Sequence, residues 1–132
     1  MSEYDVPAGR CLCGSISFTV TGPLRGVVNC HCHRCRRWTG HHMAATSAAV
    51  ADIELEGESL LGWYHPVEHA SYGFCRECGS SLFWRVSDQP ERWSICAGTL
   101  DPPTHLVTTD ALWVSEASDY CVRQDVPELE TE

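Results

Sequence analysis

The fold of this chain is decided by residues 75–79, which read Cys-Arg-Glu-Cys-Gly. Two thiols three positions apart can hold one soft metal ion, and glycine tolerates the positive φ of a chelating turn. The segment at residues 11–14, Cys-Leu-Cys-Gly, has the same ending. Together the two clusters supply the four thiolates of a closed tetrahedral zinc site: Cys11, Cys13, Cys75 and Cys78. We therefore predict a structural zinc that joins the first strand to the middle of the chain.

A third cluster at residues 30–35, Cys-His-Cys-His-Arg-Cys, lacks the glycine. Its thiols belong to Cys30, Cys32 and Cys35. Three ligands predict a second zinc with a vacant position, which is typical of a catalytic site. If the first three residues are extended, the cysteines share one face and His31 points the other way. His31 and His33 remain the nearest candidates for a fourth ligand, so a closed site of three cysteines and one histidine is the alternative.

The other histidines and the two isolated cysteines have no spacing that predicts a metal site. Five histidines are interpreted as surface or hydrogen-bonded residues: His41, His42, His65, His69 and His105. Cys96 lies in an apolar run and is expected to be buried in the core, and Cys121 stands alone.

Composition indicates one small domain over residues 1–132, with an apolar fraction of 43%. Residues 1–7 contain no apolar stretch, and no run is long enough to span a membrane, so we expect a cytoplasmic protein whose cysteines bind metal rather than form disulfides. The net charge of −9 argues against partners such as nucleic acid or anionic membranes. The sequence makes no prediction of oligomeric state.

Hydrophobic residues alternate with polar ones along most of the chain, which predicts a mainly β fold of short strands with few short helices. Ile16, Phe18 and Val20 mark the clearest strand. Other strands are expected at 27–30, 44–50, 53–55, 71–74, 82–86, 93–97 and 111–114. The alanines of residues 44–51 leave that stretch ambiguous between strand and helix. The acidic tail at 125–132 is expected to be frayed.

Three thiolates give a zinc site a net charge of −1, which makes the metal a poor generator of hydroxide. Such a site is better suited to holding an incoming thiol as a thiolate, so the residues predict a thiol that adds to a carbonyl, or the reverse cleavage. Carboxylates on that thiol would need positive partners near the cluster, and the nearest basic residues are Arg34, Arg36, Arg37 and Arg76. Trp38 is a candidate wall of the substrate pocket. The alternative for the arginines is that they only offset thiolate charge.

The order of these motifs resembles the glutathione-dependent formaldehyde-activating enzyme family, also described as GFA-like or centromere-protein-V-like. The resemblance covers residues 9–115 and includes the three cysteine clusters, the Arg-Arg-Trp-Thr-Gly that follows Cys35, and the Ala-Gly-Thr-Leu-Asp of residues 97–101. It implies a β-tent fold of short antiparallel sheets stapled by zinc. It also implies two zinc ions per chain, a structural one on the four-cysteine set and a catalytic one on the three-cysteine set.

The same resemblance implies a carbon–sulfur lyase that joins a thiol such as glutathione to a small aldehyde such as formaldehyde. Two alternatives remain at this point. One is a non-catalytic zinc-binding module that contacts a protein partner, and the other is a zinc- or redox-responsive protein that uses Cys30, Cys32 and Cys35.

Overall fold

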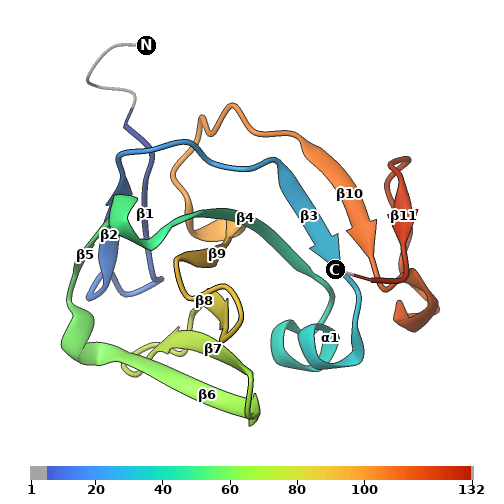
Figure 1. Ribbon diagram of the computed structural model, residues 1–132, viewed down its shortest axis with the longest axis horizontal. Coiled ribbons are helices and arrows are strands. Elements are labelled where there is room, and N and C mark those ends of the chain that lie inside the picture. Colours follow the sequence, from blue (N-terminus) through green and yellow to red (C-terminus); the bar gives the residue numbers. More distant parts are fainter. Residues whose placement is uncertain (1–5, 132) are drawn as a thin grey trace.

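The computed structural model describes residues 6–131, and strands dominate this part of the chain (Figure 1). The strands are β1 (Ala8–Arg10), β2 (Ser17–Val20), β3 (Val27–Cys30), β4 (Met43–Ala49), β5 (Ile53–Glu56), β6 (Leu61–Val67), β7 (Ala70–Cys75), β8 (Ser81–Val86), β9 (Arg92–Cys96), β10 (Thr108–Leu112) and β11 (Glu128–Leu129). The helical elements are α1 (His33–Thr39) and the 3-10 turns η2 (Val50–Asp52), η3 (Glu58–Leu60), η4 (Ala97–Thr99) and η5 (Val114–Glu116). The prediction of a mainly β protein with few short helices is confirmed. Among the described residues, no helix combines the length and the apolar character needed to cross a membrane.

The strands form two sheets. The larger sheet has eight strands in the order β11-β10-β3-β4-β9-β8-β7-β6, and the smaller has the order β1-β2-β5. In Figure 1 the larger sheet runs from β6 at the lower left to β11 at the right, and the smaller sheet lies at the left. Most strand pairs are antiparallel, as the resemblance implied, and the parallel pairs are those of β10 with β3 and with β11. Residues 97–107 carry the chain back so that β10 runs alongside β3 in the same direction.

The main hydrophobic core lies between the two sheets. Ile16, Phe18 and Val20 are buried, as the period-two pattern predicts, and the intervening Ser17 and Thr19 are partly exposed. The ring of Phe18 packs against that of Phe83 in β8, with centroids 5.2 Å apart. This contact joins the small sheet to the large one close to the first cysteine cluster.

Several elements differ from the sequence-based expectations, among them β1, which was not predicted. Helix α1 follows the third cysteine cluster, where no helix was expected, and it ends at Gly40, which has a φ of 89°. Strand β6 was not predicted, and its Pro66 is accommodated because β6 is the edge strand of the larger sheet. The tail is not simply frayed, because Glu128 and Leu129 form β11 beside β10, although Glu132 lies outside the described residues.

Candidate metal centres and the adjoining cavity

The four-cysteine cluster is assembled from the turns of two hairpins that belong to different sheets. Cys11 and Cys13 lie in the turn between β1 and β2, whereas Cys75 is the last residue of β7 and Cys78 lies in the turn that leads to β8. The Sγ atoms of Cys11 and Cys13 are 3.6 Å apart, and those of Cys13 and Cys75 are 3.8 Å apart. All four thiols lie within 4.8 Å of one another. The cluster therefore joins the two sheets at one edge of the core.

Both turns have the geometry that their glycines predict. Gly14 and Gly79 each have a φ of 80°, a conformation that disfavours other residues. The Oγ atoms of Ser15 and Ser80 lie 3.3 Å and 3.2 Å from the thiols of Cys13 and Cys78, respectively. The contact with Ser80, together with backbone N–H groups, lowers the pKa of Cys78 to about 5. This turn therefore favours the thiolate form that a metal requires.

The donor set and its spacing fit zinc. A tetrahedral zinc with Zn–S bonds of about 2.3 Å holds its sulfur atoms about 3.8 Å apart. The Sγ separations of 3.6 Å and 3.8 Å at the four-cysteine cluster are close to that value. Soft thiolates select zinc over magnesium or calcium, so these residues are suited to a closed structural site.

The three-cysteine cluster occupies the corner between β3 and α1. Cys30 is the last residue of β3, and Cys32 caps the helix by accepting a hydrogen bond from the backbone N–H of Cys35 at 3.4 Å. The three thiols lie within 4.8 Å of one another. Hydrogen bonds from Cys30 and Cys35 lower the pKa of Cys32 to about 2, whereas hydrogen bonding to Cys32 and Cys35 raises the pKa of Cys30. Without a cation the cluster thus favours one shared thiolate, and a divalent ion would allow three.

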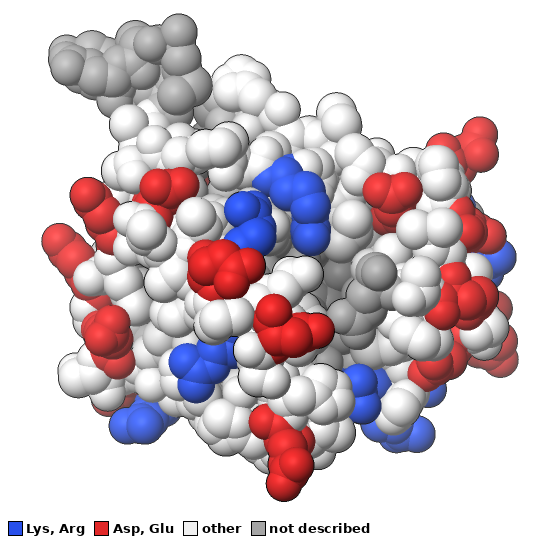
Figure 2. Space-filling view, in the orientation of Figure 1, with Lys and Arg blue, Asp and Glu red and all other residues white. Residues whose placement is uncertain are grey.

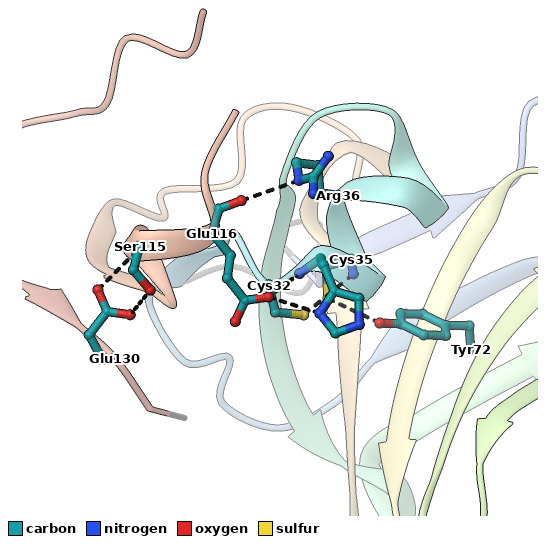
Figure 3. A network of polar contacts seen from close by, with 8 residues as sticks. Cys32, Cys35, Arg36, Tyr72, Ser115, Glu116 and Glu130 are labelled. Carbon is teal, nitrogen blue, oxygen red and sulfur yellow. Dashed lines mark hydrogen bonds and ion pairs between the residues drawn. The ribbon is translucent and has the colours of Figure 1, made fainter. Parts of the chain in front are cut away.

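Neither neighbouring histidine completes this cluster. The backbone N–H and the Nδ1 atom of His33 both lie 2.8 Å from Oε1 of Glu116, and Figure 3 shows Glu116 reaching toward this corner. His31 points away from the cysteines, as its place in an extended segment predicts, and it groups instead with His42 and Cys121. This arrangement favours the open three-thiol site over the closed alternative.

Tyr72 is the polar neighbour of the cluster that sequence reasoning missed. Its hydroxyl lies 3.1 Å from Sγ of Cys35. Figure 3 shows the Tyr72 side chain pointing toward the cysteine cluster. Burial, together with the adjacent thiolates, raises the pKa of Tyr72, so the phenol stays protonated and can donate a hydrogen bond. No spacing signal identifies it, because Tyr72 is 37 residues from Cys35 and only the sheet brings them together.

A cavity of about 760 Å³ adjoins the three thiols. Its walls come from alternate residues on one face of the larger sheet, for example Ser47 of β4, Ser94 of β9, Trp84 of β8 and Tyr72 of β7, which follow one another across the sheet. The opposite face of the same strands carries core residues such as Ile95. The period-two pattern therefore gives the larger sheet one face for the core and one for the cavity.

Two arginines line the cavity beyond the thiols. Arg25 donates from Nη2 to the carbonyl of Ala45 at 3.1 Å, and Arg92 donates from Nη2 to Oγ of Ser47 at 2.9 Å. Burial, and then the positive charge of Arg92, lowers the pKa of Arg25. Arg25 is exposed and Arg92 is half-buried. Two guanidinium groups that repel each other favour an anion between them, and planar guanidinium groups match carboxylates well. Neither arginine was among the predicted substrate residues.

Only one of the residues that the sequence predicted to bind substrate lines the cavity. Arg34 lines the cavity, whereas Arg36, Arg37, Trp38 and Arg76 are not among the lining residues. Arg36 donates from Nε to the carbonyl of Glu116 at 3.2 Å. Trp38 stacks on Tyr72 with ring centroids 5.1 Å apart, so it supports the cavity wall from behind.

Surface charge agrees with the acidic composition. On the face seen in Figure 2, carboxylates are spread widely and the arginines form a few separate patches. All nine basic residues of the chain are arginines, so lysine contributes to none of these patches. This face therefore carries no broad basic surface.

Comparisons with known proteins identify the family to which the sequence is similar and a solved structure with a similar fold. The model of a family described as glutathione-dependent formaldehyde-activating enzyme matches residues 6–116. A crystal structure of a Rhodobacter sphaeroides protein is similar with a TM-score of 0.61 and 26% sequence identity, over 72% of this chain and 88% of that chain. No curated protein matches the sequence.

Proposed function

The chain belongs to the glutathione-dependent formaldehyde-activating enzyme family, and we propose that it is a zinc-dependent carbon–sulfur lyase. The proposed reaction joins a thiol such as glutathione to a small aldehyde, or reverses that addition. The observation that carries the proposal is a cavity that is lined by three clustered thiols and, beyond them, by the side chains of Arg25 and Arg92.

Zinc at Cys30, Cys32 and Cys35 would supply a soft Lewis acid that stabilises a substrate thiolate at neutral pH. A second zinc at the four-cysteine cluster would be structural. These two assignments rest on the donor sets, the sulfur spacing and the family.

The spacing along β4 suits a carboxylate-bearing thiol. Met43 is the cross-strand partner of Cys30, and Arg25 is bonded to the carbonyl of Ala45, two residues further along β4. Two residues of strand span about 7 Å, which is close to the reach from a cysteinyl sulfur to the carboxylate of a following residue. We assign binding of the substrate carboxylates to Arg25 and Arg92, with Arg34 as a third positive group at the cavity wall.

The reaction needs no oxidant or reductant. The thiol sulfur supplies the electron pair of the new C–S bond, and the C=O π electrons move onto the aldehyde oxygen. That oxygen then takes up the proton that the thiol released, which gives a hydroxyalkyl thioether. The reverse reaction breaks the C–S bond and returns the proton to sulfur.

Tyr72 is proposed to stabilise the carbonyl oxygen. Its protonated hydroxyl is already oriented toward the thiols, at 3.1 Å from Cys35 Sγ. A hydrogen bond that forms as negative charge develops on the oxygen lowers the barrier more than it favours ground-state binding.

Exchange NMR with ¹³C-formaldehyde and glutathione tests this function. The zinc-loaded protein should accelerate interconversion of the aldehyde and the thiol adduct, and Cys32→Ser should remove the acceleration. Cys96→Ser is the matched control, because Cys96 belongs to none of the cysteine clusters. A folded, zinc-loaded protein that accelerates the exchange of neither formaldehyde nor other small aldehydes would favour the non-catalytic zinc module instead.

A further inference from the structure

A third group of metal-ligand side chains lies on the side of β3 that faces away from the cavity. It consists of His31, His42 and Cys121, whose ligand atoms lie within 4.8 Å of one another. His31 follows β3, His42 precedes β4, and Cys121 belongs to the segment after η5. The proposed reaction uses none of the three, so their convergence from distant parts of the sequence requires another explanation.

The distances between the ligand atoms are close to those of a metal-bound set. In a tetrahedral zinc site with imidazole and thiolate ligands, the ligand atoms lie about 3.3–3.8 Å apart. Because the ligand atoms of this cluster lie within 4.8 Å of one another, a small change of side-chain rotamer can bring them into that range. The rings of His31 and His42 already pack with centroids 4.9 Å apart.

One ring nitrogen of the half-buried His42 lacks a hydrogen-bond partner among the described residues. Its Nδ1 atom is buried and makes no hydrogen bond within residues 6–131. A buried polar atom without a partner is costly, so such atoms often mark the place of a water or an ion. A neutral imidazole nitrogen is a good ligand for a divalent transition metal.

A fourth ligand is close. Nε2 of His41 lies 3.9 Å from Sγ of Cys121, and its ring is 4.4 Å from that of His42. His41 is exposed, so its ring is free to turn toward the cluster. Two or three imidazoles with one thiolate form a donor set that suits zinc and other late divalent transition metals.

We propose that His31, His42 and Cys121, completed by His41, form a third site that binds a divalent transition metal of the zinc type. The neighbouring charges do not oppose a cation. The positive charge of Arg123 lies near His31, but Nε of Arg123 is paired with Oε2 of Glu128 at 2.7 Å. The negative charge of Glu128 therefore offsets the positive charge of Arg123 at His31.

A metal at this site would fix the C-terminal segment against the sheet. Nδ2 of Asn29 donates to Oε1 of Gln124 at 2.8 Å, and β11 pairs with β10. A metal bound by Cys121 would add a further link between this segment and the sheet. Leu129 of β11 lines the cavity. The third metal would therefore stabilise the cavity wall that Leu129 forms, while the metal itself would lie outside the cavity.

Metal counting on the purified full chain tests the proposal. With both cysteine clusters loaded, zinc titration of the wild-type protein should reach three equivalents, and Cys121→Ser and His42→Ala should each reach two. His105→Ala is the matched control and should retain three, because His105 is exposed and belongs to no ligand cluster. Circular dichroism verifies that each variant is folded.

Alkylation of the wild-type protein gives a second readout that needs no variant. Iodoacetamide labelling of Cys121, followed by peptide mass analysis, should be at least tenfold slower with three equivalents of zinc than with two. A wild-type protein that saturates at two equivalents, or a Cys121 thiol whose labelling rate zinc leaves unchanged, would overturn the proposal. Because the lyase assay is separate, either result leaves the proposed function standing.

Discussion

Replacing Cys13 and Cys78 together by serine should lower the melting temperature sharply, because it opens the link between the two sheets. Both side chains are at least partly exposed, so little core packing is lost with them. The link joins residues 62 positions apart. Closing a loop of that length removes about 4 kcal/mol of chain entropy from the unfolded state, by the relation used for disulfides.

This free energy converts into a temperature shift. At about 2.1 cal/mol/K per residue, the 132-residue chain has an unfolding entropy of about 0.28 kcal/mol/K. A loss of about 4 kcal/mol therefore lowers Tm by about 15 °C. The expected drop is at least this large, since the zinc bonds themselves also contribute to folding.

The assay is a thermal melt followed by circular dichroism, with zinc content measured on the same samples. The matched control is Cys32→Ser with Cys35→Ser, whose ligands all lie within residues 30–35 and close no long loop. Loss of buried contacts at Cys35 should cost about 1 kcal/mol, or about 4 °C. Equal losses of Tm in the two double variants would refute the division into a structural and a reactive site.

Three further predictions concern the cavity and the metals. Arg25→Met should raise the KM for glutathione about 10- to 100-fold, because a charge-assisted hydrogen bond to a carboxylate is lost. The same variant should leave the KM for 2-mercaptoethanol unchanged, because that thiol has no carboxylate. Arg37→Met is its control, and an equal rise for both thiols would argue against carboxylate binding. Tyr72→Phe should lower kcat about 10- to 100-fold with little change in KM, and a change confined to KM would count against its role at the carbonyl oxygen. During graded chelation, elemental analysis should find metal leaving the three-cysteine cluster while the fold persists, whereas simultaneous unfolding with the first loss would contradict unequal affinities.

The strands and the four-cysteine cluster were predictable because their signals are local. Alternation at Ile16, Phe18 and Val20 predicts one buried face, and the structure confirms it. The glycines that follow Cys13 and Cys78 predict two turns with positive φ, which both adopt. The outward direction of His31 follows from the extended backbone of its neighbours.

Helix α1 gave no such signal. It has only seven residues, which is less than two helical turns and too short to show a periodic pattern of apolar residues. Its N-cap is the thiol of Cys32 rather than the usual serine or aspartate. Strand β6 was obscured by Gly62 and Pro66, which are tolerated at the sheet edge.

The cavity depends on contacts that spacing does not reveal. Arg25, Tyr72 and Arg92 lie on separate segments and line one cavity only because β4, β7, β8 and β9 are neighbours in the sheet. Proximity in sequence to the cysteines pointed instead to Arg36, Arg37 and Trp38. The order of strands in a sheet is a long-range property, so these residues could not be found from the pattern alone.

Cobalt substitution combined with glutathione titration tests the central claim most directly. In a protein with cobalt at Cys30, Cys32 and Cys35, an added substrate thiolate should intensify the sulfur-to-metal charge-transfer band in a saturable way. Cys32→Ser with Cys35→Ser should abolish the increase, and Arg25→Met should shift it to higher glutathione concentration. A spectrum that stays unchanged across millimolar glutathione and other small thiols would contradict thiol activation at this site.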